Sequence, residues 1–279
     1  MTDLLFADLA LAQRLERTEA HANAAFVEAR ASLTPESGAT WRDMRGCWAM
    51  FDGVGSPLTQ TFGLGVFDTP DAEQLDAIEA FFAERGADVM HEVSPMADMA
   101  LLPLLASRGY AVVEWSTVLV RPLSQDFANV GSKEIPLNAS GPRVRVVNAD
   151  EADHWAAVAA EGWGETPELA DFMRSLGQVS ARADGTWSFL ASIGNADVAS
   201  GALHIHEGVA LFAGASTRPD ARRQGAQRAL FDARLSYATH VGCDLAMMVA
   251  APGSTSQKNA QRAGFRPVYT RVKWGKPTN

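Results

Sequence analysis

The sequence predicts a mixed α/β (α+β) fold with two similar domains, each a twisted, mostly antiparallel sheet flanked by helices. Three observations support this prediction. The 279 residues suit one large domain or two domains of medium size. Strands of alternating polarity and helical segments follow one another through residues 143–279. The order of elements at the end of the chain also occurs, more weakly, near the end of the first half.

The second half divides clearly into elements. Its first strand alternates over 143–147, and Asn148 and Asp150 can cap the helix that follows. Pro167 suits the first turn of another helix. Glu207 and Gly208 predict a hairpin turn between two apolar strands. The expected elements, in order, are a strand at 143–147, a helix to 163, a helix from 167, strands at 187–193, 198–206 and 209–215, a helix to about 241, a strand at 245–249, a helix, and a strand at 267–274.

The turn after the apolar strand 209–215 is the most informative segment of the chain. It carries Arg222, Arg223 and Gly225 and leads directly into a helix. The first N–H groups of a helix lack partners within the helix, and the helix dipole places positive charge there. Glycine allows a phosphate to approach the backbone closely, and the arginines add charge. The segment therefore predicts an anion site.

This turn resembles motif A of the GNAT superfamily of N-acetyltransferases, Arg/Gln-x-x-Gly-x-Gly/Ala. Arg222 and Gly225 match the motif, whereas Gln227 stands where the family has Gly or Ala. Downstream, the run 259–265 resembles the family's fourth helix, which ends in a Gly-Phe pair, here Gly264 and Phe265. The resemblance covers roughly residues 143–279.

The resemblance implies that acetyl-CoA, or a longer acyl-CoA, binds at this turn. Main-chain N–H groups of 223–228 would hold the pyrophosphate, the end of the strand near 215–217 would receive the acyl carbonyl, and Thr217 and its neighbours would pair with the pantetheine arm. The residues expected to bind the cofactor are Ala215, Ser216, Thr217, Arg222, Arg223, Gln224, Gly225, Ala226, Gln227, Arg228 and Asn259.

The resemblance also implies direct transfer of the acetyl group to a primary amine within a ternary complex. The family often has a tyrosine as general acid where this chain has Ala260, so Tyr269 is the substitute candidate. Glu161 and His204 are the candidates for the general base, and Glu165, His206 and Glu207 are further possibilities. Because the tyrosine is missing and Gln227 departs from the motif, a non-catalytic acyl-CoA-binding or regulatory protein is the alternative. A phosphate site unrelated to GNAT proteins is a third, although no Gly-Lys-Ser/Thr follows the glycine.

The first half is interpreted as a degenerate copy of the second. Residues 88–109 and 244–264 share an Asp, a proline-bearing turn and a helix that ends in glycine. At the equivalent of the cofactor turn, residues 67–75 are acidic and would repel a pyrophosphate. The predicted organisation is therefore a domain over 1–122 without the cofactor motif, a linker over 123–142, and a cofactor-binding domain over 143–279.

Composition limits the partners. The net charge of −9 divides into −11 for residues 1–142 and +2 for 143–279, and neither half has a basic stripe, so nucleic acid is not expected. No apolar stretch is long enough to span a bilayer. Two isolated cysteines and no Cys/His cluster favour a cytoplasmic setting without a metal. The expected partner is a small-molecule or peptide amine, bound by a monomer or homodimer.

Overall fold

The computed structural model describes residues 6–123 and 141–277. The contacts divide the chain into two compact units. Unit 1 comprises residues 1–120 and 249–279, and unit 2 comprises residues 121–248. Most of the predicted linker, residues 124–140, lies outside the described residues. Its first residue, Leu123, donates its N–H to the Asp244 carbonyl oxygen at 2.8 Å.

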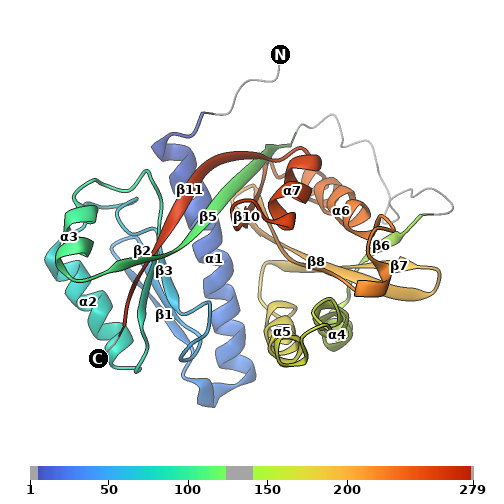
Figure 1. Ribbon diagram of the computed structural model, residues 1–279, viewed down its shortest axis with the longest axis horizontal. Helices are drawn as coiled ribbons and strands as arrows, with labels where there is room; N and C mark the ends of the chain where they lie inside the picture. Colours follow the sequence, from blue (N-terminus) through green and yellow to red (C-terminus); the bar gives the residue numbers. More distant parts are fainter. Residues whose placement is uncertain (1–5, 124–140, 278–279) are drawn as a thin grey trace. The chain divides into compact units, whose positions relative to one another are not determined.

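Unit 1 is a mixed sheet with helices on both faces (Figure 1). Its strands follow the order β1-β2-β3-β4-β11-β5, in which only β3 and β4 are parallel neighbours. The elements are α1 (Leu9–Leu33), β1 (Thr40–Met44), β2 (Cys47–Phe51), β3 (Gln60–Phe62), α2 (Ala72–Ala83), β4 (Val89–Val93), α3 (Leu101–Ser107), β5 (Ala111–Pro122), α7 (Thr255–Arg262) and β11 (Arg266–Lys276).

The alternation of side chains along β2 places helices on opposite faces of this sheet. Met50 packs with small residues of α1, whereas Ala49 and Phe51 pack with α2 and α3. Asp8 begins α1 by accepting the Leu11 N–H at 2.8 Å. The sequence analysis did not assign a helix to this segment.

The last strand of the sequence, β11, lies between β4 and β5 in unit 1. Val272 is paired with Val93 on one side and with Trp115 on the other. The sequence division places this strand and α7 with residues 143–248, whereas the contacts group both with the first half of the chain.

Unit 2 has the mostly antiparallel sheet that the sequence predicts. Its strands follow the order β10-β9-β8-β7-β6, and only β9 and β10 are parallel. Helix α6 covers one face, and α4 and α5 cover the other (Figure 1). The elements are β6 (Arg143–Val146), α4 (Ala152–Glu161), α5 (Pro167–Ser180), β7 (Thr186–Ile193), β8 (Ala196–His206), β9 (Val209–Thr217), α6 (Ala226–His240) and β10 (Leu245–Ala250), whose last two residues belong to unit 1.

Two turns that the sequence analysis singles out are present, one in each unit. The predicted hairpin turn at Glu207 and Gly208 is present, and both residues have positive φ. In unit 1, the acidic turn before α2 is closed by its own contacts. Asp71 accepts the Gln74 N–H at 2.8 Å, and Arg45 pairs with both Asp71 and Asp68 at 2.7 Å.

Candidate functional site

A β-bulge interrupts the middle of β9. Ser200 of β8 faces Ser216, and Ala202 faces Ala213, so the single residue Gly201 opposes both Gly214 and Ala215. Gly214 has a φ of +59°, a conformation that favours glycine. Although β9 is an internal strand of the order, residues 213–215 are exposed. The bulge therefore presents main-chain groups to solvent where a regular strand would pair them.

Strands β9 and β10 pair only at their beginnings. The described pairs are Val209 with Leu245, Ala210 with Ala246, and Leu211 with Met247, and no later pair follows within unit 2. Beyond Leu211, the edge of β9 toward β10 has no strand partner in the described part of this unit. Such an edge can pair with an extended ligand.

The predicted anion turn lies at the end of β9. A short 3₁₀ helix, Pro219–Ala221, precedes Arg223 with a φ of +64° and Gly225 with a φ of +88°. Gly225 is the N-cap of α6, and no side chain caps this helix. The first helical bond is donated by Ala229 to the Gly225 carbonyl oxygen at 3.0 Å. The N–H groups of 226–228 therefore precede the helical hydrogen-bond ladder.

A Cβ added at Gly225 would make only ordinary van der Waals contact. This Cβ would lie 3.9 Å from the nearest atoms, which belong to Pro142. Since packing does not exclude a side chain here, the positive φ is what requires glycine. Left-handed residues at Arg223 and Gly225, followed by an uncapped helix start, are backbone features typical of anion sites.

The Arg222 side chain connects this turn to the segment between α4 and α5. Its guanidinium donates to the Gly162 carbonyl oxygen and pairs with Glu165, both at 3.0 Å. A third bond reaches the Thr217 carbonyl oxygen at 3.4 Å. Arg222 therefore lies at the turn, as the motif implies, but its donors are directed toward protein acceptors.

Gln227, the departure from the motif, contacts the end of β9. Its amide donates to the Ser216 carbonyl oxygen at 3.1 Å and to the Thr217 hydroxyl at 2.8 Å. The side chain thus ties the first turn of α6 to β9.

The remaining predicted cofactor residues fall into two groups. Gln224 donates to the Asp220 carbonyl oxygen at 3.1 Å, Arg228 pairs with Asp232 at 2.8 Å, and Ala226 is buried, all at the turn. Asn259, in contrast, belongs to α7 in unit 1.

Serine hydroxyls join the bulge to α4. The Ser216 hydroxyl donates to the Ala159 carbonyl oxygen at 2.8 Å and lies 3.1 Å from the Ser200 hydroxyl. Ser200 also donates to the Gly214 carbonyl oxygen at 3.1 Å. Ser200 and Gly214 are not among the residues predicted from the sequence, although a glycine inside an apolar strand is a recognised signal of a bulge.

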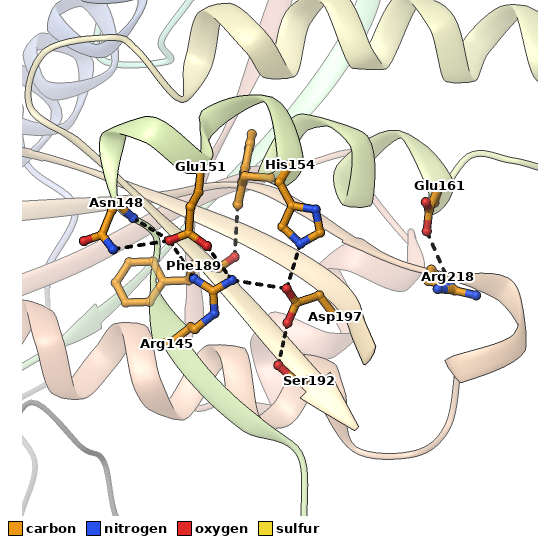
Figure 2. Close-up of polar contacts among 10 residues, drawn as sticks. Arg145, Asn148, Glu151, His154, Glu161, Phe189, Ser192, Asp197 and Arg218 are labelled. Carbon is orange, nitrogen blue, oxygen red and sulfur yellow. Dashed lines mark hydrogen bonds and ion pairs between the residues drawn. The ribbon is translucent and has the colours of Figure 1, made fainter. Parts of the chain in front are cut away.

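The three catalytic candidates are not brought together in unit 2. Glu161, at the end of α4, lies 3.5 Å from Arg218 near the end of β9 (Figure 2). His204 is buried in β8, where its Nδ1 lies 3.2 Å from the Thr186 hydroxyl. Tyr269 belongs to β11 in unit 1, and its buried hydroxyl donates to Glu16 at 2.9 Å.

A separate polar cluster surrounds Asp197. Its carboxylate accepts from the Ser192 hydroxyl and contacts His154 at 2.8 Å and Arg145 at 3.2 Å (Figure 2). Arg145 also pairs with Glu151, which closes a capping box with Asn148. These contacts join the β7–β8 hairpin to the start of α4, so we assign the cluster a structural role.

The described part of the chain offers no candidate for a metal site or a membrane-spanning helix. No group of three or more His, Cys, Asp or Glu residues there could hold a metal ion. None of the described helices is both long and apolar enough to cross a membrane. Both cysteines, Cys47 and Cys243, are buried free thiols.

No family model matches this chain, and no curated protein matches its sequence. Solved structures do resemble its fold. A GCN5-related N-acetyltransferase from Kribbella flavida is 23% identical, covers 91% of this chain and 96% of its own, and has a TM-score of 0.60. A tandem GNAT protein from the clavulanic acid biosynthesis pathway is 16% identical, with coverages of 84% and 79% and a TM-score of 0.58. A GCN5-related N-acetyltransferase from Sphaerobacter thermophilus is 18% identical, with coverages of 83% and 76% and a TM-score of 0.53.

These similarities extend over both halves of the chain. The protein therefore has the GNAT fold in tandem, which confirms the fold class predicted from the turn and the internal copy.

Proposed function

We propose that this protein is an N-acetyltransferase that transfers an acetyl group from acetyl-CoA to the primary amine of a small molecule or peptide. The transfer is direct, within a ternary complex, and the site is in unit 2. The turn of 222–228 binds the pyrophosphate, and the free edge of β9 binds the pantetheine arm.

The parting of β9 and β10 is the observation that carries this proposal. It leaves the edge of β9 beyond Leu211 without a strand partner in unit 2, between the pairing with β10 and the uncapped start of α6. A phosphate at the helix start and an extended amide chain along the edge together match the chemistry of acyl-CoA. A ligand that needed only a phosphate site would make no use of this edge.

The bulge supplies the electrostatic part of the reaction. An N–H group of residues 214–216 that is not paired in the ladder can donate to the thioester carbonyl as negative charge develops on its oxygen. Holding the thioester close to the amine can supply roughly 7–11 kcal/mol of the barrier reduction. A thiol of pKa about 8.5 can leave without a general acid, so the proposal does not depend on Tyr269.

Glu161 is the candidate that we retain as the general base. It is exposed at the end of α4, and the neighbouring Ser216 of β9 contacts the same helix through Ala159. A carboxylate here can accept the amine proton directly or through one water. Residues 1–122 form a degenerate domain without a cofactor turn in this proposal.

A thermal-shift experiment with acetyl-CoA tests the cofactor site. Ligand at 100 times its dissociation constant adds about 2.7 kcal/mol to the free energy of unfolding. The wild-type protein should show the corresponding rise in melting temperature, and Gly225→Glu should abolish it by placing a carboxylate at the start of α6, where the pyrophosphate is proposed to bind.

Gly194→Glu is the matched control. Gly194 also has a positive φ, with open space where a Cβ would lie, and it belongs to the β7–β8 turn of the same unit. The control should lose intrinsic stability as Gly225→Glu does but retain the shift with acetyl-CoA. A wild-type protein that shows no shift contradicts the proposed function.

A non-catalytic acyl-CoA-binding protein is the second candidate. It is favoured by Ala260 at the position of the family's tyrosine and by the engagement of Tyr269 with Glu16. Binding of acetyl-CoA without release of its thiol, across a panel of primary amines, would support this candidate instead.

A further inference from the structure

Arg234 of α6 is a buried arginine behind the β9 bulge. The residue is 1% exposed, and no carboxylate among the described residues forms an ion pair with it. Its nearest aromatic neighbours are Phe212 and Phe231, whose ring centres lie 4.7 and 5.2 Å from Cζ. Burial of an unpaired cation is costly, which calls for an explanation of why an arginine stands on this apolar helix face.

The guanidinium bonds to both strands at the bulge. Nη1 donates to the Ala202 carbonyl oxygen of β8 at 3.2 Å and to the Ala213 carbonyl oxygen of β9 at 3.3 Å. Nε donates to the Leu230 carbonyl oxygen within α6 at 3.1 Å. Because a bulge disrupts the ladder between its strands, these bonds replace pairing that the backbone has lost.

The sheet also provides the space for this side chain. A Cβ added at Gly201, the residue opposite the bulge, would lie 3.0 Å from Cζ and 3.1 Å from Nε of Arg234. The remaining nitrogen, Nη2, is buried without a hydrogen-bond partner in the described residues. This arrangement therefore costs the hydrogen bond of one donor within the protein, while the other guanidinium donors bond to the strands and to α6.

We propose that Arg234 is a positioning residue for acyl transfer: it holds the β9 bulge from the α6 side, and the bulge holds the N–H groups that receive the thioester carbonyl. This inference rests on the proposed function. It gives Arg234 a role in stabilising the transition state through the bulge rather than a role in binding the cofactor. The reason is that its contacts lie at the bulge and not at the turn of 222–228. Burial lowers the pKa of Arg234 to about 9, so the guanidinium remains charged at neutral pH.

Arg234→Met and Arg234→Lys test this role. Methionine keeps the apolar stem but removes every donor, whereas lysine retains a charge and a donor. Thiol release from acetyl-CoA with a panel of primary amines should show at least a tenfold lower kcat for Arg234→Met. The KM for acetyl-CoA should stay within threefold of the wild-type value. Arg234→Lys should recover part of the lost kcat.

Two further variants separate positioning from packing. Leu235→Ala removes a buried neighbour on the same helix and should lower the melting temperature while leaving kcat unchanged. Gly201→Ala leaves the charge in place but displaces the guanidinium, so it should lower kcat at least threefold. It carries the test if both Arg234 variants fail to fold.

The outcomes distinguish this inference from the proposed function. If the wild-type protein neither binds acetyl-CoA nor releases its thiol, the proposed function fails and the inference fails with it. If the wild-type protein is active and Arg234→Met or Gly201→Ala has an unchanged kcat, the inference alone is overturned. A raised KM with an unchanged kcat would also overturn it, because the equal fall in kcat/KM then indicates a loss of binding.

Discussion

Arg271 of β11 and Glu16 of α1 form an ion pair of 3.2 Å in unit 1, and each side chain is 1% exposed. Glu19 lies 2.8 Å from the same guanidinium, and Glu92 of β4 lies 3.6 Å from it. Tyr269 donates its hydroxyl to Glu16. A buried charge network therefore joins the beginning of the chain to its last strand.

Removing the cation from this network should be strongly destabilising. Arg271→Met leaves the buried Glu16 carboxylate without its counter-ion, and breaking a buried pair in this way costs about 3–5 kcal/mol. Urea denaturation followed by circular dichroism measures the loss. Glu114→Gln is the control, because Glu114 pairs with Lys273 while 53% exposed, and exposed pairs contribute at most about 1 kcal/mol. A loss below 1 kcal/mol for Arg271→Met would contradict the prediction.

His91 should make unit 1 sensitive to acid. Burial lowers the pKa of His91 to about 3 in the folded protein, against 6.5 for an ordinary histidine. The unfolded chain therefore binds the proton first, so the stability contributed by the neutral ring is complete above pH 6.5 and is lost as the pH falls toward 3. The expected loss is about 1.4 kcal/mol per pH unit within this window.

His91→Gln tests this dependence. Denaturation midpoints between pH 7 and pH 4.5 should fall less steeply for the variant than for the wild-type protein, because glutamine does not titrate. Parallel curves for the two proteins would show that another group causes the acid sensitivity.

Glu165 should compete with the cofactor for Arg222. Both side chains of this pair are largely exposed, so the pair contributes at most about 1 kcal/mol. Glu165→Gln removes the carboxylate partner of the guanidinium and leaves its bonds to the Gly162 and Thr217 carbonyl oxygens. The dissociation constant for acetyl-CoA should therefore fall by up to about fivefold in isothermal titration. Glu168→Gln removes the same charge three residues later and should have a smaller effect. Weaker binding by Glu165→Gln would indicate that Glu165 orders the site instead.

The two cysteines should be silent in a thiol-release assay. Burial raises the pKa of the Cys47 thiol to about 12, and Cys243 is buried as well. Since the thiolate is the reactive form, Ellman's reagent should detect neither thiol in the native protein and two per chain in denaturant. Rapid native labelling would reveal a local opening.

Local patterns predicted unit 2 well. Strand polarity, the proline at 167, and the turn at Glu207 and Gly208 each depend on neighbours in the sequence, and the structure confirms the elements that they indicate. The turn of 222–228 also lies before a helix as the sequence predicts, because Arg222, Gly225 and the helix start are contiguous, and its role as an anion site stays a prediction.

The partner of β11 could not be predicted in this way. An apolar alternating strand fits any sheet of the right polarity, and the internal copy offers two similar sheets. The pairing of β11 with the strands of unit 1 is fixed by contacts between residues that are distant in sequence, such as Arg271 with Glu16 and Val272 with Val93. Arg234 was missed for a similar reason, since only the fold brings a helix side chain to the carbonyl oxygens of a bulge.

The position of β11 between β4 and β5 limits when this sheet can be completed during synthesis of the chain. Strands β4 and β5 leave the ribosome early, but the strand that belongs between them is synthesised roughly 140 residues after β5. At 5–20 residues per second, the nascent chain must wait about 7–30 s with these two strands unjoined. During that interval the edges of β4 and β5 that later pair with β11 lack this partner, and unpaired strand edges are prone to pairing with other chains.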